Sequence, residues 1–199
     1  MNLIDYIHSD YIHIRRVEVL KKHLIRLIQE SSTLLDVGAG DGLLDFVIMQ
    51  KRPDIKIKSI DPVIRNKTYV PVSSFNGKSI PFDDSSFDIV MFIDILHHTE
   101  DPLALLKEAK RVASKSIIIK DHTQSGLFAK TTLSLMDKVG NEKHDIKITR
   151  NYWTEEKWFN AFTELELEVI FWDKKIGLYP FPLNLIFDRS LHFIAMLNK

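Results

Sequence analysis

Glycines and acids alternate in one short stretch of the chain, from Asp36 to Gly42, which reads Asp-Val-Gly-Ala-Gly-Asp-Gly. The aliphatic residues before it predict a buried strand, and Leu43 to Gln50 predict a helix directly after it. Gly38 and Gly40 have no side chain to keep a ligand from the backbone, and the first amide groups of a helix lack partners within it. The stretch therefore predicts a tight turn that holds a ligand against backbone amides.

The charges of this turn restrict the ligand. A dinucleotide would place its pyrophosphate on the helix N-terminus, where the carboxylates of Asp36 and Asp41 would repel it. The dinucleotide fingerprint also has a third glycine where this chain has Leu43. A zwitterion that carries an ammonium and a sulfonium meets no such repulsion, so the turn disfavours an NAD-dependent oxidoreductase. A helix-capping turn without any ligand is the alternative.

Another acid, Asp61, ends the next predicted strand, which begins at Ile55. It follows the glycine turn by about 20 residues, the separation at which α/β nucleotide-binding folds place a carboxylate for ribose hydroxyls. We therefore predict that Asp61 binds a ribose. The alternative is that Asp61 is an ordinary turn residue before a proline.

Histidines and aspartates follow two further predicted strands, 87–93 and 115–120. Ligands of open α/β sheets bind at the carboxyl ends of the strands, so His98 and His122 are expected beside the ligand, with Asp94 or Asp121 able to orient one of them. Histidine is the side chain whose unperturbed pKa is nearest to working pH. We predict a catalytic set of His98, His122 and Asp121, while a purely loop-shaping role stays open.

The same residues are poor candidates for a metal site. Adjacent histidines such as His97 and His98 rarely point the same way, and the chain has no helical His-to-His spacing. A metal hydrolase is therefore disfavoured, and we predict no metal.

Composition limits the function classes. The 199 residues fit one domain, lysine plus arginine and aspartate plus glutamate both count 27, and cysteine is absent. Disulfides, thiolate metal sites and a cysteine nucleophile are excluded, and the balanced charge gives no long-range attraction to nucleic acid. The N-terminus lacks a leader pattern and no stretch approaches the ~20 apolar residues of a spanning helix. We expect a cytoplasmic protein with no nucleic-acid partner.

Alternating strand and helix patterns predict an α/β fold in a single domain, 1–199. The helices are expected at 14–28, 43–50, 102–112, 127–139 and from 154 onward, and the strands at 33–37, 55–62, 69–72, 87–93, 115–120, 165–172 and 191–197. Only 61–68 separate the second strand from the third, whereas a parallel crossover usually takes a dozen or more residues. The helix between these strands is therefore expected to be missing. Residues 1–32 form an N-terminal helical segment, and 125–152 form an insertion on the substrate side.

The glycine turn, residues 79–90 (Ser-Ile-Pro-Phe-Asp-Asp-Ser-Ser-Phe-Asp-Ile-Val), Leu96-His97-His98 and Asp101-Pro102 together resemble the class I S-adenosylmethionine-dependent methyltransferases, in particular the group called type 11. The resemblance covers residues 33 to about 120. It implies a Rossmann-like three-layer sandwich whose seven-stranded, mostly parallel sheet has the order 3-2-1-4-5-7-6 and an antiparallel last strand. The family's usual glycine pair before strand five is replaced by Ala113-Ser114.

The resemblance also implies the cofactor S-adenosyl-L-methionine and places residues around it. Asn76 aligns with the position that accepts a hydrogen bond from the adenine amino group, Gly77 offers its amide to the ring, and Asp94 and Ile95 border the methionine end. With the residues of the turn and of the second strand, the predicted cofactor set is Asp36, Gly38, Ala39, Gly40, Asp61, Pro62, Asn76, Gly77, Asp94 and Ile95.

The function expected from this set is in-line transfer of a methyl group. The insertion and residues 179–185 contain more apolar side chains than packing against the sheet needs, which favours a small-molecule or lipid-like acceptor. These side chains are Phe128, Leu133, Met136, Tyr152, Phe181 and Leu185. Core packing explains these residues equally well. Because fold does not establish activity, a cofactor-binding module or regulator without turnover is the second hypothesis.

Overall fold

The computed structural model describes residues 3–126, 128–141 and 151–199. In this part of the chain, seven strands form one sheet with the order β3-β2-β1-β4-β5-β7-β6. The strands are β1 (Thr33–Val37), β2 (Lys56–Asp61), β3 (Val72–Ser74), β4 (Phe87–Ile93), β5 (Ala113–His122), β6 (Glu168–Asp173) and β7 (His192–Asn198). Strand β7 is antiparallel to β5 and β6, and the other pairs are parallel. The predicted fold class and strand order are confirmed.

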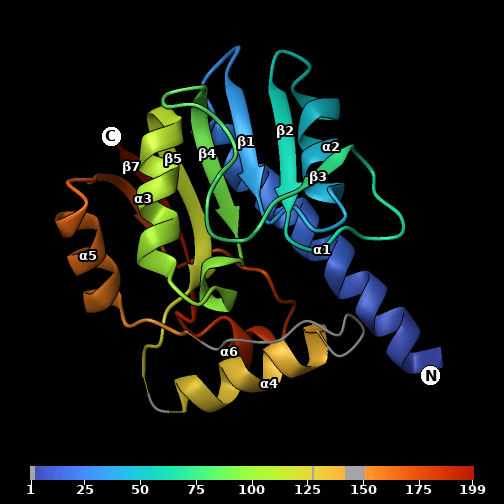
Figure 1. Cartoon of the computed structure of the whole chain (residues 1–199). Coiled ribbons are helices and arrows are strands. Elements are labelled where there is room, and N and C mark those ends of the chain that lie inside the picture. Colours follow the sequence, from blue (N-terminus) through green and yellow to red (C-terminus); the bar gives the residue numbers. More distant parts are fainter. Residues whose placement is uncertain (1–2, 127, 142–150) are drawn as a thin grey trace.

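Helices cover both faces of the sheet (Figure 1). They are α1 (Leu3–Leu27) and α2 (Leu43–Lys51) on one face, α3 (Pro102–Val112) and α5 (Glu155–Glu164) on the other, and α4 (Ala129–Asn141) and α6 (Asn184–Phe187) beyond the carboxyl ends of the parallel strands. A 3₁₀ turn, η1 (Leu96–His98), follows β4. Asp101 caps α3 through Ala104 N, and Thr154 caps α5 through Lys157 N. Both helices therefore begin where their sequence signals predict.

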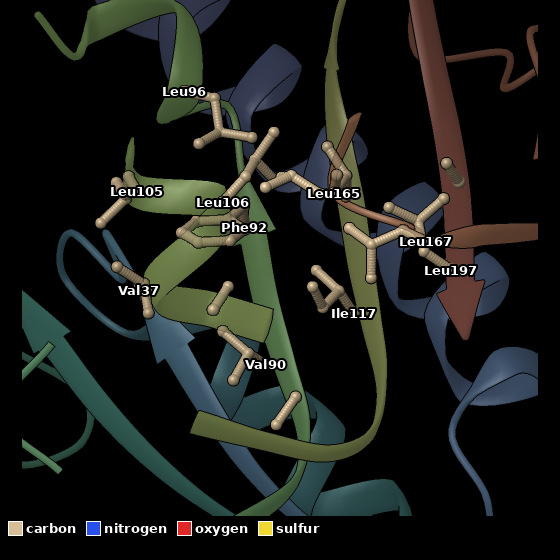
Figure 2. Packing of buried hydrophobic residues seen from close by; sticks show 14 of the residues in the cluster. Val37, Val90, Phe92, Leu96, Leu105, Leu106, Ile117, Leu165, Leu167 and Leu197 are labelled. Atoms are coloured by element: carbon tan, nitrogen blue, oxygen red, sulfur yellow. The ribbon is translucent and has the colours of Figure 1, made fainter. Parts of the chain in front are cut away.

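Two apolar clusters lie on the two faces of the sheet. One joins α3 and α5 to the sheet, and Figure 2 shows its packing around Phe92 of β4, Leu106 of α3 and Ile117 of β5. The other joins α1 and α2 to the opposite face through residues such as Leu24 and Ile48. Trp153 and Trp158 pack with ring centroids 4.7 Å apart at the start of α5. The two clusters fix the strand ends, so the loops that follow the strands have defined positions.

The connection from β2 to β3 contains no helix in the described residues, as the short spacing predicts. Lys56 and Lys58 of β2 are exposed on the uncovered side. The third strand, expected at 69–72, is instead Val72–Ser74. The expected bounds were wrong because Pro71 has no amide to donate, while the amide of Tyr69 donates to Asp41 O at 2.8 Å.

Other boundaries also differ from the sequence-based ones. Strand β5 continues through Asp121 and His122, and α6 lies in the long connection between β6 and β7. The first helix, expected from residue 14, begins at Leu3, and Ile14 is 58% exposed. Leu127, the expected start of the fourth helix, lies outside the described residues. No helix in the described ranges combines the length and apolarity needed to cross a membrane.

Candidate functional site

One cavity lies where the carboxyl ends of β1, β2, β4 and β5 meet the N-terminal helix. The ten residues predicted to contact the cofactor all line it, and so do the two predicted catalytic histidines, His98 and His122. The third predicted catalytic residue, Asp121, is fully buried behind the cavity wall. The carboxyl ends of parallel strands share one edge of a sheet, which explains why residues spread from 36 to 122 come together.

The glycine turn is held by β2. The amides of Gly38 and Ala39 donate to Ile60 O at 2.8 and 3.2 Å. Gly40 N donates to one carboxylate oxygen of Asp61 at 2.8 Å, and Val63 N donates to the other at 2.8 Å. Each oxygen keeps a lone pair for a ligand hydroxyl. Asp61 therefore shapes the turn and faces the cavity at the same time.

Gly38 and Gly40 allow a matched test of this turn. Gly38 has φ +90°, and an added Cβ would lie 2.6 Å from Cγ1 of Ile95, whereas Gly40 has φ +61° with nothing within 4 Å of that position. Gly38→Ala is expected to lower the free energy of unfolding by about 2–4 kcal/mol, and Gly40→Ala by only about 1 kcal/mol. Urea unfolding measures both, and equal losses would contradict the packing of Gly38 against Ile95.

A buried carboxyl pair lies beneath the turn. Burial, and next the charge of Asp45, raise the pKa of Asp36 well above its usual value. Burial also raises the pKa of Asp45 to about 6, although Ser59 Oγ donates to it at 2.5 Å. Two facing buried carboxyl groups are stable when they share a proton. Asp45 could not be singled out from the sequence, because it occupies an ordinary helical position.

Asn76 shapes a turn at the far end of the cavity. Its carbonyl oxygen accepts from the amides of Lys78 and Ser79 at 2.9 and 2.8 Å. An amide oxygen has two lone pairs, and these two bonds occupy them. The predicted contact from this oxygen to an adenine amino group stays a prediction, and it requires one of these bonds to be released. Gly77, with φ +73°, follows in the same turn.

Asp94 connects three elements at the opposite end. It has a left-handed backbone, with φ 55°. One carboxylate oxygen pairs with Arg16 of α1, and the other accepts from Lys120 Nζ at 2.5 Å. Burial by itself would raise the pKa of Asp94, but the charges of Arg16 and Lys120 outweigh it and hold that pKa well below its usual value. Asp94 is therefore an anion that ties the N-terminal helix to the cavity.

Lys120 is a buried cation that sequence reasoning missed. Its side chain is 0% exposed, and burial lowers its pKa. Besides Asp94, it contacts His192 Nδ1 at 3.3 Å, while His192 Nε2 lies 3.1 Å from Phe187 O. A carbonyl only accepts, so Nε2 carries the proton and Nδ1 accepts from Lys120. Burial lowers the pKa of His192 well below its usual value, which agrees with a neutral ring.

Asp121 holds the two histidines that flank it. Its Oδ1 lies 2.6 Å from His97 Nδ1 and accepts from His122 N at 2.6 Å, and its Oδ2 accepts from Leu96 N at 3.0 Å. Burial would raise the pKa of Asp121, but the charge of His97 and these bonds keep it well below the usual value. Asp121 thus orients other groups and does not reach the cavity.

His122 presents its ring to the cavity from the end of β5. Its Nδ1 lies 3.5 Å from an oxygen of Asp94 and 3.5 Å from an oxygen of Asp121. Burial, and next the charge of His97, lower the pKa of His122. A neutral imidazole beside two carboxylates can take up a proton and be stabilised once charged.

Asp94, His97, Asp121 and His122 could also be considered as metal ligands, because one ligand atom from each lies within 4.8 Å of the others. The carboxylate oxygens already have partners, however. Asp94 pairs with Arg16 and Lys120, and Asp121 accepts from histidine and backbone donors. Two cations balance the two carboxylates, so a divalent ion would add uncompensated charge to a buried site. We interpret the cluster as a hydrogen-bond network.

The apolar residues expected in an acceptor pocket lie in three different places: the cavity wall, a separate buried cluster and the surface. Met136 of α4 lines the cavity, as does Tyr179. Leu133 and Tyr152 are buried in a small separate cluster. Phe128, Phe181 and Leu185 are 75, 78 and 61% exposed, on or beside α4 and α6. Residues 142–150 of the predicted insertion lie outside the described part of the chain.

Comparison with known proteins adds family information to this geometry. A family model described as a methyltransferase domain matches residues 11–178. A methyltransferase of Schizosaccharomyces pombe is 26% identical over 116 residues, which cover 49% of this chain and 42% of the relative. A tRNA U34 carboxymethyltransferase of Nautilia profundicola is 28% identical over 116 residues, 53% of this chain and 37% of the relative. The chain spans 30 to 51% of the length of the curated relatives it matches.

Solved structures share the fold over nearly the whole chain. A chain in the complex between the Haloferax volcanii Trm112 methyltransferase activator and a methyltransferase has a TM-score of 0.69 at 15% identity, with 100% of this chain and 98% of that chain covered. A SAM-dependent methyltransferase from Methanosarcina mazei has a TM-score of 0.59 at 19% identity, with 86 and 94% covered. At these identities the likeness shows the fold alone.

Proposed function

The chain belongs to the S-adenosylmethionine-dependent methyltransferase family, and on that premise we propose that it transfers a methyl group to a small-molecule or lipid-like acceptor, with His122 as the proton acceptor. The observation that carries the proposal is that one cavity is lined by all ten predicted cofactor residues and by His122. Enzymes of this class need two partners held in line and, for a protonated acceptor, a base.

The residues of the cavity fit the parts of S-adenosylmethionine. Asp61 has carboxylate lone pairs for ribose hydroxyls, and the glycine turn leaves room for the nucleoside beside it. Asp94 and Arg16 pair with each other in this structure, and that ion pair would have to open for them to hold the ammonium and the carboxylate of the methionine end. The cofactor supplies an electrophilic methyl group on a sulfonium, and this chain's residues position it and exclude water.

His122 has the better position of the two predicted catalytic histidines. It lines the cavity and has two carboxylate oxygens 3.5 Å from Nδ1, which stabilise the imidazolium that forms when a proton is taken from the acceptor. His98, on η1, also lines the cavity. We assign it a secondary role at the acceptor end.

The acceptor is proposed from the cavity wall and its surroundings. Met136 and Tyr179 give the wall an apolar part, and α4 and α6 bear exposed apolar side chains nearby, such as Leu135 and Ile186 at 54 and 51% exposure. The zero net charge provides no general attraction to polynucleotides. A tRNA acceptor, which the name of the Nautilia relative raises, is the competing outcome.

Cofactor binding is tested by thermal unfolding. S-adenosylhomocysteine at a hundred times its dissociation constant is expected to add about 2.7 kcal/mol of stability, whereas NAD at the same concentration adds none because of the acids in the glycine turn. Equal shifts with both ligands, or no shift with either, would contradict the proposal.

Turnover is tested with S-adenosylmethionine labelled in its methyl group. Medium-chain fatty acids, alkylphenols and total tRNA serve as the three acceptor probes. Label in an apolar small molecule but not in tRNA is expected. Efficient labelling of tRNA alone would replace the acceptor class, and cofactor binding without labelling of any acceptor would favour a binding module.

A further inference from the structure

Three polar side chains meet beneath the glycine turn, on the face of the sheet that α2 covers. Asp36 of β1 and Ser59 of β2 are partners in the parallel register, so their side chains lie on the same face. Asp45 of α2 packs onto them, and its Oδ2 accepts from Ser59 Oγ at 2.5 Å. Asp36, Asp45 and Ser59 are only 3, 0 and 1% exposed. Two carboxyl groups are therefore enclosed together in the protein interior.

The two carboxyl groups have too few hydrogen-bond donors around them. The single hydrogen of the Ser59 hydroxyl is used on Asp45. Oδ1 of Asp36 and Oδ1 of Asp45 are both buried, and no donor in the described part of the chain reaches either atom. The two carboxyl groups nevertheless hydrogen-bond to each other. Because an ionised carboxyl group only accepts, the pair must hold a proton.

Neighbouring charges favour retention of this proton. Asp61 of β2 opposes the ionisation of Asp36, and Asp41 of the glycine turn opposes that of Asp45. In residues 3–126, 128–141 and 151–199, no ion pair joins either carboxyl group to a cation. Other charged or titratable groups share the cavity from the elements packed around the pair. They are Asp94 after β4, His13 and Arg16 of α1, and Arg65 and Lys67 after β2.

Asp36 also faces the ligand, because it lines the cavity, whereas Asp45 lies behind the wall. A positive charge in the cavity stabilises the ionised form of a neighbouring carboxyl group. We propose that the Asp36–Asp45 pair is a proton-linked element of the cofactor site, which holds one proton in the free chain and releases it to solvent when S-adenosylmethionine binds. The inference deepens the proposed function and rests on the cofactor occupying this cavity.

The linkage gives the site its second negative charge only when a cation is present. The free pair carries one negative charge, which avoids the cost of burying two like charges together. S-adenosylmethionine brings an ammonium and a sulfonium, and the pair with two negative charges attracts them more strongly. Binding that releases a proton becomes tighter as the pH rises, with a slope equal to the number of protons released.

Calorimetric titration measures the released proton. The full chain is titrated with S-adenosylmethionine at pH 7 in phosphate, HEPES and Tris, whose ionisation enthalpies differ, so the buffer dependence of the heat gives the number of protons. About 0.5–1 proton per bound molecule is expected, with affinity that rises about 3–10-fold per pH unit between pH 6.5 and 7.5. The neutral probe 5′-methylthioadenosine, which lacks both cationic groups, is expected to release none.

Asp45→Asn removes the shared proton with little change of shape. The amide oxygen still accepts from Ser59 Oγ, and the NH₂ group donates to Asp36, which then stays ionised. Proton release is expected to fall below about 0.2 per molecule, and affinity to become independent of pH and tighter than wild type at pH 6.5. A purely structural role would weaken binding at every pH. Asp54→Asn, whose partner Arg52 lies outside the cavity lining, is the matched control and keeps the wild-type slope.

The histidines that line the cavity are the same in all these proteins, so the difference between wild type and Asp45→Asn belongs to the pair. Binding by the wild-type chain without proton release, or equal release in Asp45→Asn, would overturn the inference and leave the cofactor site standing. No binding by the wild-type chain at any pH would refute the proposed function itself.

Ser59→Ala decides if Asp45→Asn does not fold. The hydrogen bond from Ser59 lowers the pKa of Asp45, so its loss makes the pair hold protons to higher pH. The pH range over which affinity rises is then expected to move upward. An unmoved range in Ser59→Ala would overturn the inference.

Discussion

Replacing His122 with glutamine is expected to lower the turnover number by about 10²–10⁴-fold for an acceptor that must lose a proton, because general-base catalysis contributes that much. Glutamine keeps most of the side-chain volume but cannot take up the proton. Affinity for S-adenosylhomocysteine should stay close to wild type, since His122 is not among the residues proposed to hold the cofactor. Steady-state kinetics with labelled cofactor, together with a binding titration, measure both quantities.

The pH dependence gives an independent check on the same residue. The neutral form of His122 is the active one, so turnover rises with pH as the ring loses its proton. Because burial lowers the pKa of His122, the rise is expected below the usual histidine value of about 6.5, with a plateau at neutral pH. A larger loss in His98→Gln than in His122→Gln would move the base to His98.

Replacing Lys120 with methionine is expected to have the largest effect on stability, about 3–5 kcal/mol. The fully buried ammonium pairs with Asp94 and His192, and its removal leaves Asp94 with Arg16 as its remaining cationic partner. Methionine fills a similar volume, so the loss reports the ion pair more than a cavity. Denaturant unfolding followed by circular dichroism measures it.

The same strand provides the control. Lys115 pairs with Asp88 at 2.8 Å but is 54% exposed, so Lys115→Met should cost less than about 1 kcal/mol. Adding Asp94→Asn to Lys120→Met should recover part of the loss, because it removes the unbalanced carboxylate. A loss in Lys120→Met no greater than in Lys115→Met would contradict the network described around Asp94.

The sequence could predict the cavity because parallel strands end at a common edge. Asp36 lies one residue before the end of β1, Asp61 ends β2 and Asp94 follows β4, and strand periodicity located those ends to within a residue or two. No side-chain contact had to be known to bring them together. The missing helix between β2 and β3 was likewise predictable from the length of the connection alone.

The buried network was not predictable from local pattern. A lysine after three isoleucines, as at Lys120, has the pattern of a solvated strand end. Its burial depends on β7, which pairs with β5, and on α1, which carries Arg16. Both elements are far from Lys120 in the sequence. The third strand was predicted too early in the chain for a related reason. Tyr69 and Val70 have high β propensity, but the amide of Tyr69 donates to the carbonyl oxygen of Asp41 and so does not pair in the sheet.

The central claim is that S-adenosylmethionine binds in the cavity with its ribose on Asp61, and calorimetric titration with S-adenosylhomocysteine tests it most directly. The wild-type chain should bind one equivalent, and Asp61→Ala should bind about 10–100-fold more weakly, through loss of charge-assisted hydrogen bonds to the ribose. Asp54→Ala, whose carboxylate pairs with Arg52 outside the cavity lining, should bind like wild type. Equal affinity of Asp61→Ala and wild type, or no binding by the wild-type chain, would contradict the claim.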